Sequence, residues 1–230
     1  MAKASAKRRT GGGRSGARER TGLTRERLVV AGLALAEREG IEAVTLRRLA
    51  DELGARPMSL YTYIRDKDEL LDAMFSELVR EIAGQVEGDT WQAQLGSLGR
   101  VITRVFTARR NLLPLATRLG DAAPFLPVLA SLLAAMRRDG FGPERAVGVF
   151  TMVVSYALGV VFFMNMLVTA EGVSPAVQLR VLLARLPPEL IPAAALPDGL
   201  VDPEAMVAAG LDLLIDSLER ERDGARLRPA

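Results

Sequence analysis

Apolar side chains recur every three or four residues from Thr24 onward, the spacing of one face of an α-helix. Thr24 precedes the first run and Gly40 follows it, as an N-cap and a helix stop do. A second run begins after Thr45 and stops at Gly54, and a third begins at Pro57, a residue suited to the first helical turn. We therefore expect three helices in the first third of the chain.

Asp66 opens a longer fourth helix as its N-cap, with Glu69 in the position of a capping box. Turn-forming Gly, Pro and Asn residues divide the rest of the chain, and no strand-like alternation is visible. The pattern predicts an all-α fold, with a small N-terminal domain and a larger helical domain. The further helices are expected over residues 90–109, 112–119, 123–139, 144–170, 175–185 and 203–222.

The charge of the chain is unevenly distributed. The net charge is +2, but residues 1–20 carry seven basic residues against one acidic residue, whereas the remaining chain carries 23 basic and 27 acidic residues. Residues 1–20 also lack apolar periodicity, so we expect a disordered basic arm. This arm is either a solubilising tail or a segment that follows a polyanion such as DNA.

The 230 residues include neither His nor Cys. Disulfides, thiolate metal sites and Cys nucleophiles are excluded, and so are the Ser-His-Asp triad and nearly every catalytic zinc site. We expect no enzyme activity, no metal and no cofactor. No apolar run follows the basic N-terminus, so a signal peptide is not expected and a cytoplasmic location is.

Residues 45–67 (TLRRLADELGARPMSLYTYIRDK) have the pattern of a helix-turn-helix, with a tight turn at Gly54 and a small residue, Ala50, at the helix crossing. No carboxylate lies between Arg56 and Arg65, so the second helix can approach DNA in a major groove. A generic helical hairpin is the alternative. The residues predicted to face DNA are Arg47, Arg56, Met58, Ser59, Tyr61, Thr62, Tyr63 and Lys67.

Residues 24–72 resemble the DNA-binding domain of the TetR (tetracycline-repressor-like) family of bacterial transcription regulators. The resemblance rests on AGLALAEREG at 31–40, VTLRRLA at 44–50 and SLYTYI at 59–64, followed by Lys67. The family often has His where Tyr63 stands and Phe where Ile64 stands. Length, helix count and the long apolar helix resemble the tetracycline-repressor-like C-terminal domain.

The resemblance implies a homodimer that places two recognition helices in successive major grooves of a double-stranded operator. It adds Pro57 to the residues facing DNA, where this residue shapes the start of the helix. It assigns Tyr61 and Lys67 to phosphates. It places Arg47, Arg56, Met58 and Thr62 near bases.

Residues 146–170 carry no charge and are long enough to span a bilayer. The segment has no flanking Trp and no basic cluster at one end, so we expect a buried helix rather than a membrane helix. Small residues on one face allow close helix approach, which suits the dimer that the resemblance implies. The predicted dimer residues are Gly148, Ser155, Gly159, Met206, Leu211, Leu214 and Leu218, with Leu213 beside them.

Large soft side chains on the same helix suit a pocket for a small hydrophobic effector, with ordinary core packing as the alternative. Without His, a tetracycline–magnesium effector held through an imidazole is not expected. The candidate pocket residues are Trp91, Arg104, Phe150, Met152, Tyr156, Phe163, Met164 and Asn165.

The sequence predicts a ligand-responsive DNA-binding regulator, most simply a repressor released by its effector. The expected layout is a basic arm over 1–20, a DNA-binding domain over 21–66, an effector-binding and dimerisation domain over 67–222 and a flexible tail over 223–230. Two alternatives remain: a helical ligand carrier or enzyme with an incidental helix-turn-helix, and a membrane-tethered regulator using residues 146–170.

Overall fold

The computed structural model describes residues 22–118, 121–167, 175–187 and 202–226. Every regular element within these ranges is a helix, which confirms the all-α prediction for the described part of the chain. The predicted basic arm over residues 1–20 lies outside it. The elements are α1 (Arg25–Glu39), η1 (Ile41–Ala43), α2 (Leu46–Leu53), α3 (Pro57–Leu60), α4 (Lys67–Ala83), α5 (Trp91–Ala108), η2 (Arg110–Thr117), η3 (Ala123–Phe125), α6 (Leu126–Arg138), α7 (Pro143–Met166), α8 (Pro175–Leu183) and α9 (Pro203–Arg226).

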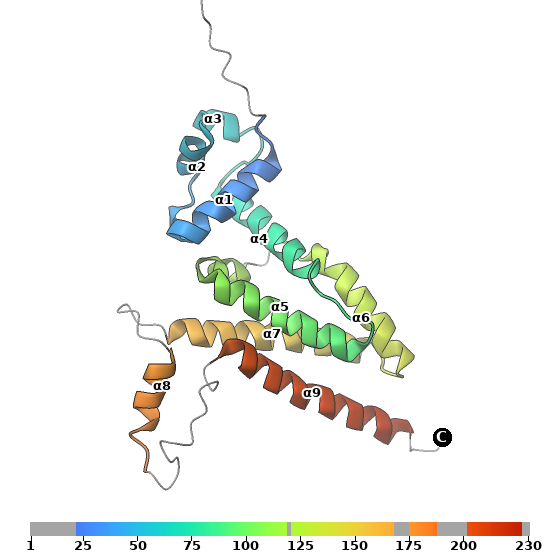
Figure 1. The fold of residues 1–230 in the computed structure, drawn as a ribbon. Coiled ribbons are helices and arrows are strands. Elements are labelled where there is room, and N and C mark those ends of the chain that lie inside the picture. The colour runs from blue at the N-terminus through green and yellow to red at the C-terminus, as the bar shows by residue number, and fades with distance from the viewer. Residues whose placement is uncertain (1–21, 119–120, 168–174, 188–201, 227–230) are drawn as a thin grey trace, which may run out of the picture.

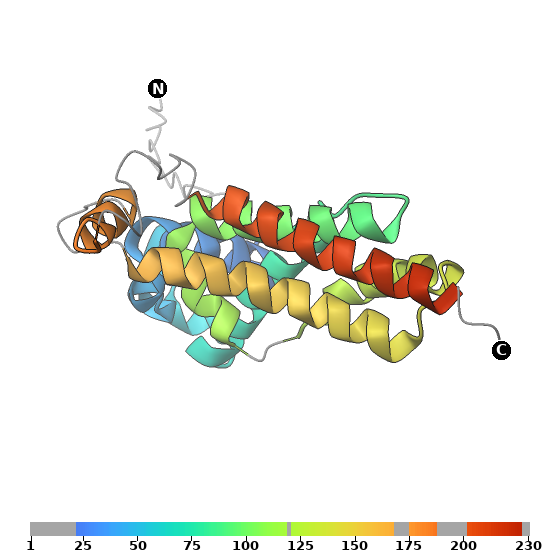
Figure 2. The same ribbon diagram turned by 90° about the horizontal axis from the view of Figure 1, so that it is seen from below.

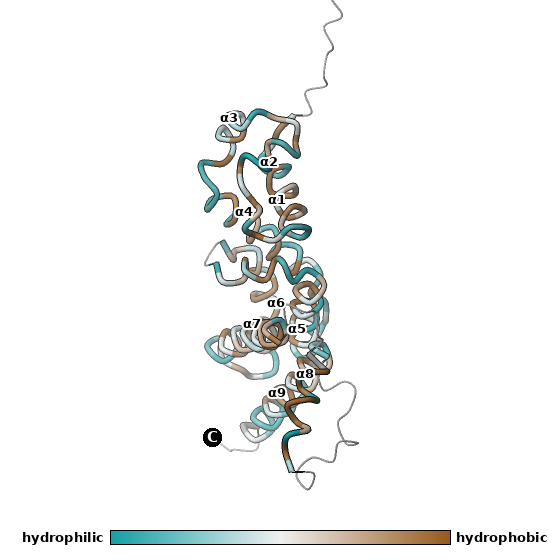
Figure 3. Tube along the Cα trace, turned by 90° about the vertical axis from the view of Figure 1, so that its left-hand side faces the viewer, coloured by the Kyte–Doolittle hydropathy of each residue, from teal (hydrophilic) through white to brown (hydrophobic). Residues whose placement is uncertain are grey.

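The helices form an elongated molecule with α2 and α3 at one end and α9 at the other (Figure 1). Helix α4 runs from the small domain into the large one, where α5 packs against α7 and α9. Hydrophobic and hydrophilic residues alternate along α1 and α4 (Figure 3), because each helix turns one apolar stripe into the core. One continuous hydrophobic core therefore extends from Leu28 in α1 to Leu218 in α9.

Side-chain caps fix the starts of α1, α2, α4 and α5. The side-chain oxygens of Thr24, Thr45 and Asp66 accept hydrogen bonds from the backbone N–H groups three residues later, at 3.2, 3.1 and 2.8 Å. These three caps confirm the predicted helix starts. Thr90 caps α5 in the same way, at 3.2 Å from the nitrogen of Ala93.

Some helix boundaries differ from those predicted from the sequence. Helix α3 has only four residues, and a turn follows it in which the N–H of Tyr63 donates to the carbonyl oxygen of Leu60 at 2.9 Å. Residues Arg110–Thr117 form a 3-10 helix rather than an α-helix, with Pro114, which has no N–H to donate, inside it. Helix α9 continues to Arg226, so the first four residues of the predicted tail are helical, and residues 227–230 lie outside the described part.

Helix α7 buries one stripe of side chains, half-buries Phe150, Val154 and Leu158, and exposes most of its other side chains. By length and composition it is apolar enough to cross a membrane, with a mean hydropathy of 2.2 over its most apolar window, of which 33% is buried. It packs against α5, α6 and α9, as a core helix does. The buried stripe consists of Ala146, Val149, Val153, Ala157, Val160, Val161 and Met164.

Candidate functional site

The turn between α2 and α3 is set by Gly54, which has a positive φ of 62°. The N–H of Gly54 donates to the carbonyl oxygen of Asp51 at 3.2 Å, and the N–H of Ala55 donates to that of Ala50 at 2.8 Å. This pair of bonds is a Schellman motif, which ends α2 and reverses the chain toward α3. The small side chain of Ala50 is fully buried at the crossing, as the sequence predicted.

Helix α3 is anchored by two buried side chains and presents the others to solvent. Leu60 is 0% exposed and Ile64 is 1% exposed, whereas Met58 is 76% and Tyr61 is 50% exposed. Eight of the nine predicted DNA-facing residues are therefore exposed, and the ninth, Lys67, is half-buried. The other exposed members are Arg47, Arg56, Pro57, Ser59, Thr62 and Tyr63.

Lys67 is the first residue of α4, where the helix N-terminus adds a positive potential to its own charge. Its Nζ lies 3.8 Å from a carboxylate oxygen of Glu42, whose side chain is 95% exposed. Such an exposed ion pair contributes little to stability, so the ammonium can exchange this partner for a phosphate.

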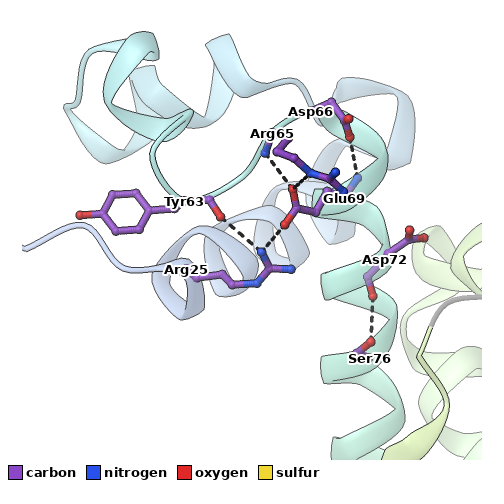
Figure 4. A network of polar contacts seen from close by, with 7 residues as sticks. All are labelled: Arg25, Tyr63, Arg65, Asp66, Glu69, Asp72 and Ser76. Atoms are coloured by element: carbon purple, nitrogen blue, oxygen red, sulfur yellow. Dashed lines mark hydrogen bonds and ion pairs between the residues drawn. The ribbon is translucent and has the colours of Figure 1, made fainter.

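Glu69 ties the end of residues 57–65, which we call the recognition segment, to α1 (Figure 4). The guanidinium of Arg25 donates to Glu69 Oε1 at 2.5 Å and to the carbonyl oxygen of Tyr63 at 3.3 Å. The backbone nitrogen and Nε of Arg65 each donate to Glu69 Oε2 at 2.9 Å. The Tyr63 ring points away from this network. Glu69 therefore positions the backbone of the segment that carries the exposed tyrosines.

The capping-box prediction for Glu69 is corrected by these bonds. A capping box requires Glu69 to accept from the backbone nitrogen of Asp66, but its carboxylate accepts from that of Arg65 instead. Hydrogen bonds from Arg25, then from the backbone and side chain of Arg65, lower the pKa of Glu69 to about 2. The carboxylate is thus ionised at neutral pH.

An apolar cavity of about 240 Å³ lies in the large domain. Helix α4 forms one wall with four side chains at positions i, i+3, i+4 and i+7. These four residues are not among the pocket residues predicted from the sequence, although that spacing marks a helix face. The lining within the described part of the chain is Phe75, Leu78, Val79, Ile82, Ile102, Phe106, Ala116, Ala122, Phe125, Phe150, Val154 and Leu158.

Of the eight predicted pocket residues, Phe150 lines this cavity. Trp91 is corrected to a core residue: it is 2% exposed, donates from Nε1 to Asp139 at 2.8 Å and packs edge-on against Phe141. Asn165 lines another hollow, of about 270 Å³, between the two domains.

The other predicted pocket residues also lie outside the apolar wall. Arg104 donates to Gln85 at 2.8 Å, and Tyr156 donates to the carbonyl oxygen of Met206 at 2.7 Å. Met164 belongs to the buried stripe of α7, whereas Met152 and Phe163 are exposed. Met152, Tyr156, Phe163 and Met164 share α7 with Phe150, whereas Arg104 belongs to α5, and none of these residues is among those that line the cavity.

Helices α7 and α9 run side by side along one face of the molecule (Figure 2). On this face Gly148, Ser155 and Gly159 are exposed, and a Cβ on either glycine would meet nothing within 4 Å. Leu213 of α9 is 71% exposed. Three small residues of α7 and the exposed Leu213 of α9 therefore form an open stripe along the helix pair.

The dimer prediction is corrected at two positions of α9. Leu211 is 2% and Leu218 is 0% exposed, because both are packed in the core of the same chain. Leu211 lies directly against Gly99 of α5, where an added Cβ would come within 2.5 Å of its Cδ1. Met206 and Leu214 are half-buried.

Two arginines that flank η2 attach this segment to α1 and α4. Arg109 Nε donates to Glu37 of α1 at 2.6 Å, and its Nη1 donates to Glu81 of α4 at 2.6 Å. Arg118 Nε donates to Asp72 of α4 at 2.7 Å. Between these clamps, Ala116 of η2 lines the apolar cavity.

A larger hollow, of about 480 Å³, lies where the turn before α7 meets the end of α9. It is lined by charged residues, but Arg222 contacts Asp139 at 3.2 Å and Arg145 pairs with Glu221. These arginines already have carboxylate partners. The hollow therefore provides a weaker binding site for an anion than the number of arginines in its lining implies.

Comparison with known proteins adds two family matches. The family described as "Bacterial regulatory proteins, tetR family" matches residues 28–74, and "Tetracyclin repressor-like, C-terminal domain" matches residues 83–222.

Individual relatives are transcription regulators. The HTH-type transcriptional repressor DrrR1 of Streptomyces coeruleorubidus is 32% identical over 144 residues, which cover 60% of this chain and 52% of that protein. The chain thus spans about half the length of DrrR1. The tetracycline repressor protein class D of Escherichia coli is 27% identical over 202 residues, which cover 86% of this chain and 89% of that protein.

Among solved structures, apo ActR from Streptomyces coelicolor is similar with a TM-score of 0.68 and 26% identity, covering 88% of this chain and 98% of that one. ActR from Streptomyces coelicolor in complex with actinorhodin gives a TM-score of 0.64 at 27% identity, and the match covers 86% of this chain and 96% of that one.

Proposed function

We propose, from the premise that this chain belongs to the TetR family of bacterial regulatory proteins, that it is a homodimeric transcriptional repressor. In this proposal it binds a double-stranded operator and releases it when a small hydrophobic effector occupies the apolar cavity. The observation that carries the proposal is the outward face of α3, anchored by Leu60 and Ile64 and free of carboxylates between Arg56 and Arg65.

This face can make the contacts that DNA recognition requires. The tyrosine and threonine hydroxyls reach phosphates, and the methyl groups of Thr62 and Met58 can contact a thymine methyl. Arg47 and Arg56 supply donors for guanine edges, and Lys67 supplies a phosphate contact at the α4 N-terminus. The Glu69 network supports this role because it holds the recognition segment against α1 before DNA arrives.

The open stripe of α7 and α9 is the proposed dimer surface. Pairing two copies through it would form a four-helix bundle, and binding to successive major grooves then requires the two α3 helices to lie about 34–36 Å apart, one duplex turn. Burial in this bundle also accounts for the apolar surface of α7. A membrane tether would instead require α7 to leave its packing against α5, α6 and α9.

Helix α4 is the proposed lever between the two sites. Its first residue, Lys67, belongs to the DNA face, and its side chains from Phe75 to Ile82 line the cavity. Arg109 and Arg118 attach the cavity segment η2 to α1 and α4. An effector that favours one position of α4 would shift the population away from the DNA-binding geometry, and a coupling of about 1–3 kcal/mol suffices.

A gel-shift with DNA flanking the protein's own gene tests the proposal. We expect Tyr61→Ala and Lys67→Ala to weaken binding, whereas Arg137→Ala, an exposed arginine on α6, leaves it unchanged. Raising salt from about 50 to 200 mM should weaken binding by orders of magnitude, because phosphate contacts release counterions. Unchanged binding in both face variants, or binding insensitive to salt, would refute this docking.

A further inference from the structure

The wall of the apolar cavity carries information about the ligand that it can hold. Each of the twelve described side chains that line it is Phe, Leu, Val, Ile or Ala, so none of these side chains can donate or accept a hydrogen bond. A ligand hydroxyl or amide placed there would lose its water without a replacement, which costs about 1–3 kcal/mol or more per group. An ionised group would cost more still.

The size of the cavity limits the size of the ligand that it can hold. Its volume of about 240 Å³ lies below the roughly 300–1,000 Å³ that encloses a drug-sized ligand. An apolar protein cavity of about 150 Å³ accommodates benzene. The space is therefore suited to about two fused rings and is too small for a four-ring compound.

Four phenyl rings give the wall an aromatic character. Phe125 and Phe150 meet edge to face, with centroids 5.8 Å apart and planes at 77°. Phe75 and Phe106 complete the set. Phenyl edges and faces attract a flat ring beyond the gain from burying its surface, by offset-stacked and edge-to-face contacts.

The wall is also unsuited to a metal chelate. Oxygen, nitrogen and thiolate side chains bind metal ions, and the lining residues that the structure describes include none of them. The whole sequence lacks His and Cys. A chelate would thus bring charge into the cavity without a side chain to hold it.

We infer that the effector is a neutral, metal-free aromatic compound of about two fused rings, without an ionised group. This inference rests on the proposed function, because it takes the cavity as the effector site. Leu78, Val79 and Ile82 are each at most 3% exposed, so such a ligand would lie directly against α4.

Three probes test the inference on the full-length protein: naphthalene, 2-naphthoate, and tetracycline with Mg²⁺. We expect naphthalene to bind and to release operator DNA, as measured by fluorescence titration and gel-shift. We expect 2-naphthoate to bind about 100-fold more weakly, because its carboxylate would be desolvated without a partner. Magnesium-dependent tetracycline binding should be absent. Equal or tighter naphthoate binding, failure of naphthalene to bind, or magnesium-dependent tetracycline binding would overturn the inference.

A pair of variants on one helix locates the binding site. Val154→Phe fills the cavity and should abolish naphthalene binding, whereas Val147→Phe adds the same ring at a position of α7 that is 43% exposed and should not. Ala116→Leu fills the cavity from η2 and serves as a second test if Val154→Phe fails to fold. Unimpaired naphthalene binding in a folded cavity variant contradicts the inference.

The outcome for DNA separates this inference from the proposed function. A protein that binds its operator but none of the aromatic probes refutes the ligand class while its DNA-binding role stands. A protein that binds naphthalene in the cavity but no DNA refutes the proposed function while the ligand class stands.

Discussion

The recognition end and the cavity end of the molecule place their functional side chains by different means. At α3 the side chains belong to one short stretch and are oriented by nearby backbone features, the Gly54 turn and the Asp66 cap. The cavity collects residues from Phe75 to Leu158, which meet only because α4, α5 and α7 pack together. Local substitutions should therefore disable the first site, whereas the second depends on how the helices are packed and clamped.

The largest expected effect belongs to the large domain, at the proposed dimer surface on α7. Ser155→Arg places a large charged side chain on the open stripe of α7, and in a two-fold dimer the interface would bury this side chain twice. Burying an unpaired charge is strongly unfavourable, so we expect monomers by analytical ultracentrifugation and loss of operator binding. Ala134→Arg, at an exposed position of α6, is the matched control and should remain dimeric.

The turn at Gly54 provides the sharpest local test. Gly54→Val forces a β-branched residue into a left-handed conformation, at a cost of about 1–2 kcal/mol in the free energy of unfolding. No atom lies within 4 Å of the added Cβ, so the effect comes from the backbone alone. We expect Gly54→Asn, which tolerates this conformation, to retain most stability and operator affinity. Thermal unfolding and gel-shift measure both, and equal loss in both variants would contradict the argument.

The ion pairs of Arg109 and Arg118, which attach η2 to α1 and α4, should affect how strongly the effector changes operator affinity. They should affect effector binding or operator binding by itself less. Arg118→Met removes the ion pair with Asp72 and should reduce the effector's influence on operator affinity by about 0.5–2 kcal/mol. Arg80→Met is the control, since Arg80 pairs with Glu77 on the same helix. Operator affinity with and without a bound aromatic ligand gives the coupling. An undiminished ratio in Arg118→Met would show that the clamp transmits nothing.

The smallest effect is a pH dependence that originates at Glu69. Its pKa is about 2 in the folded chain and about 4.3 in an unfolded one, so its stabilisation is complete above about pH 4.3 and is lost as the pH falls toward 2. Glu69→Gln should flatten the fall of stability in this window, as followed by urea unfolding at several pH values. Asp89→Asn, at an exposed loop position, should leave the slope as in the native protein.

Much of the small domain could be predicted from the sequence because its signals are local. The side chains of Thr24, Thr45 and Asp66 cap the helices that follow them directly in the sequence, and Gly54 marks a turn that needs a left-handed residue. The outward face of α3 followed from the apolar pair Leu60 and Ile64, which is buried. What the spacing of Asp66 and Glu69 could not reveal was the attachment to Arg25, which lies 44 residues away from Glu69.

By itself the sequence determined where the helices begin, which side chains α3 presents and which chemistries are absent, because caps, periodicity and composition act within a few residues. Only the tertiary structure decided which apolar residues enclose the cavity and which face outward. Leu211 and Leu213 are equally apolar and two positions apart on α9, yet the first is 2% exposed and the second 71%. Periodicity predicts that a helix has an apolar stripe, but the helix packed against it decides which residues of that stripe are covered.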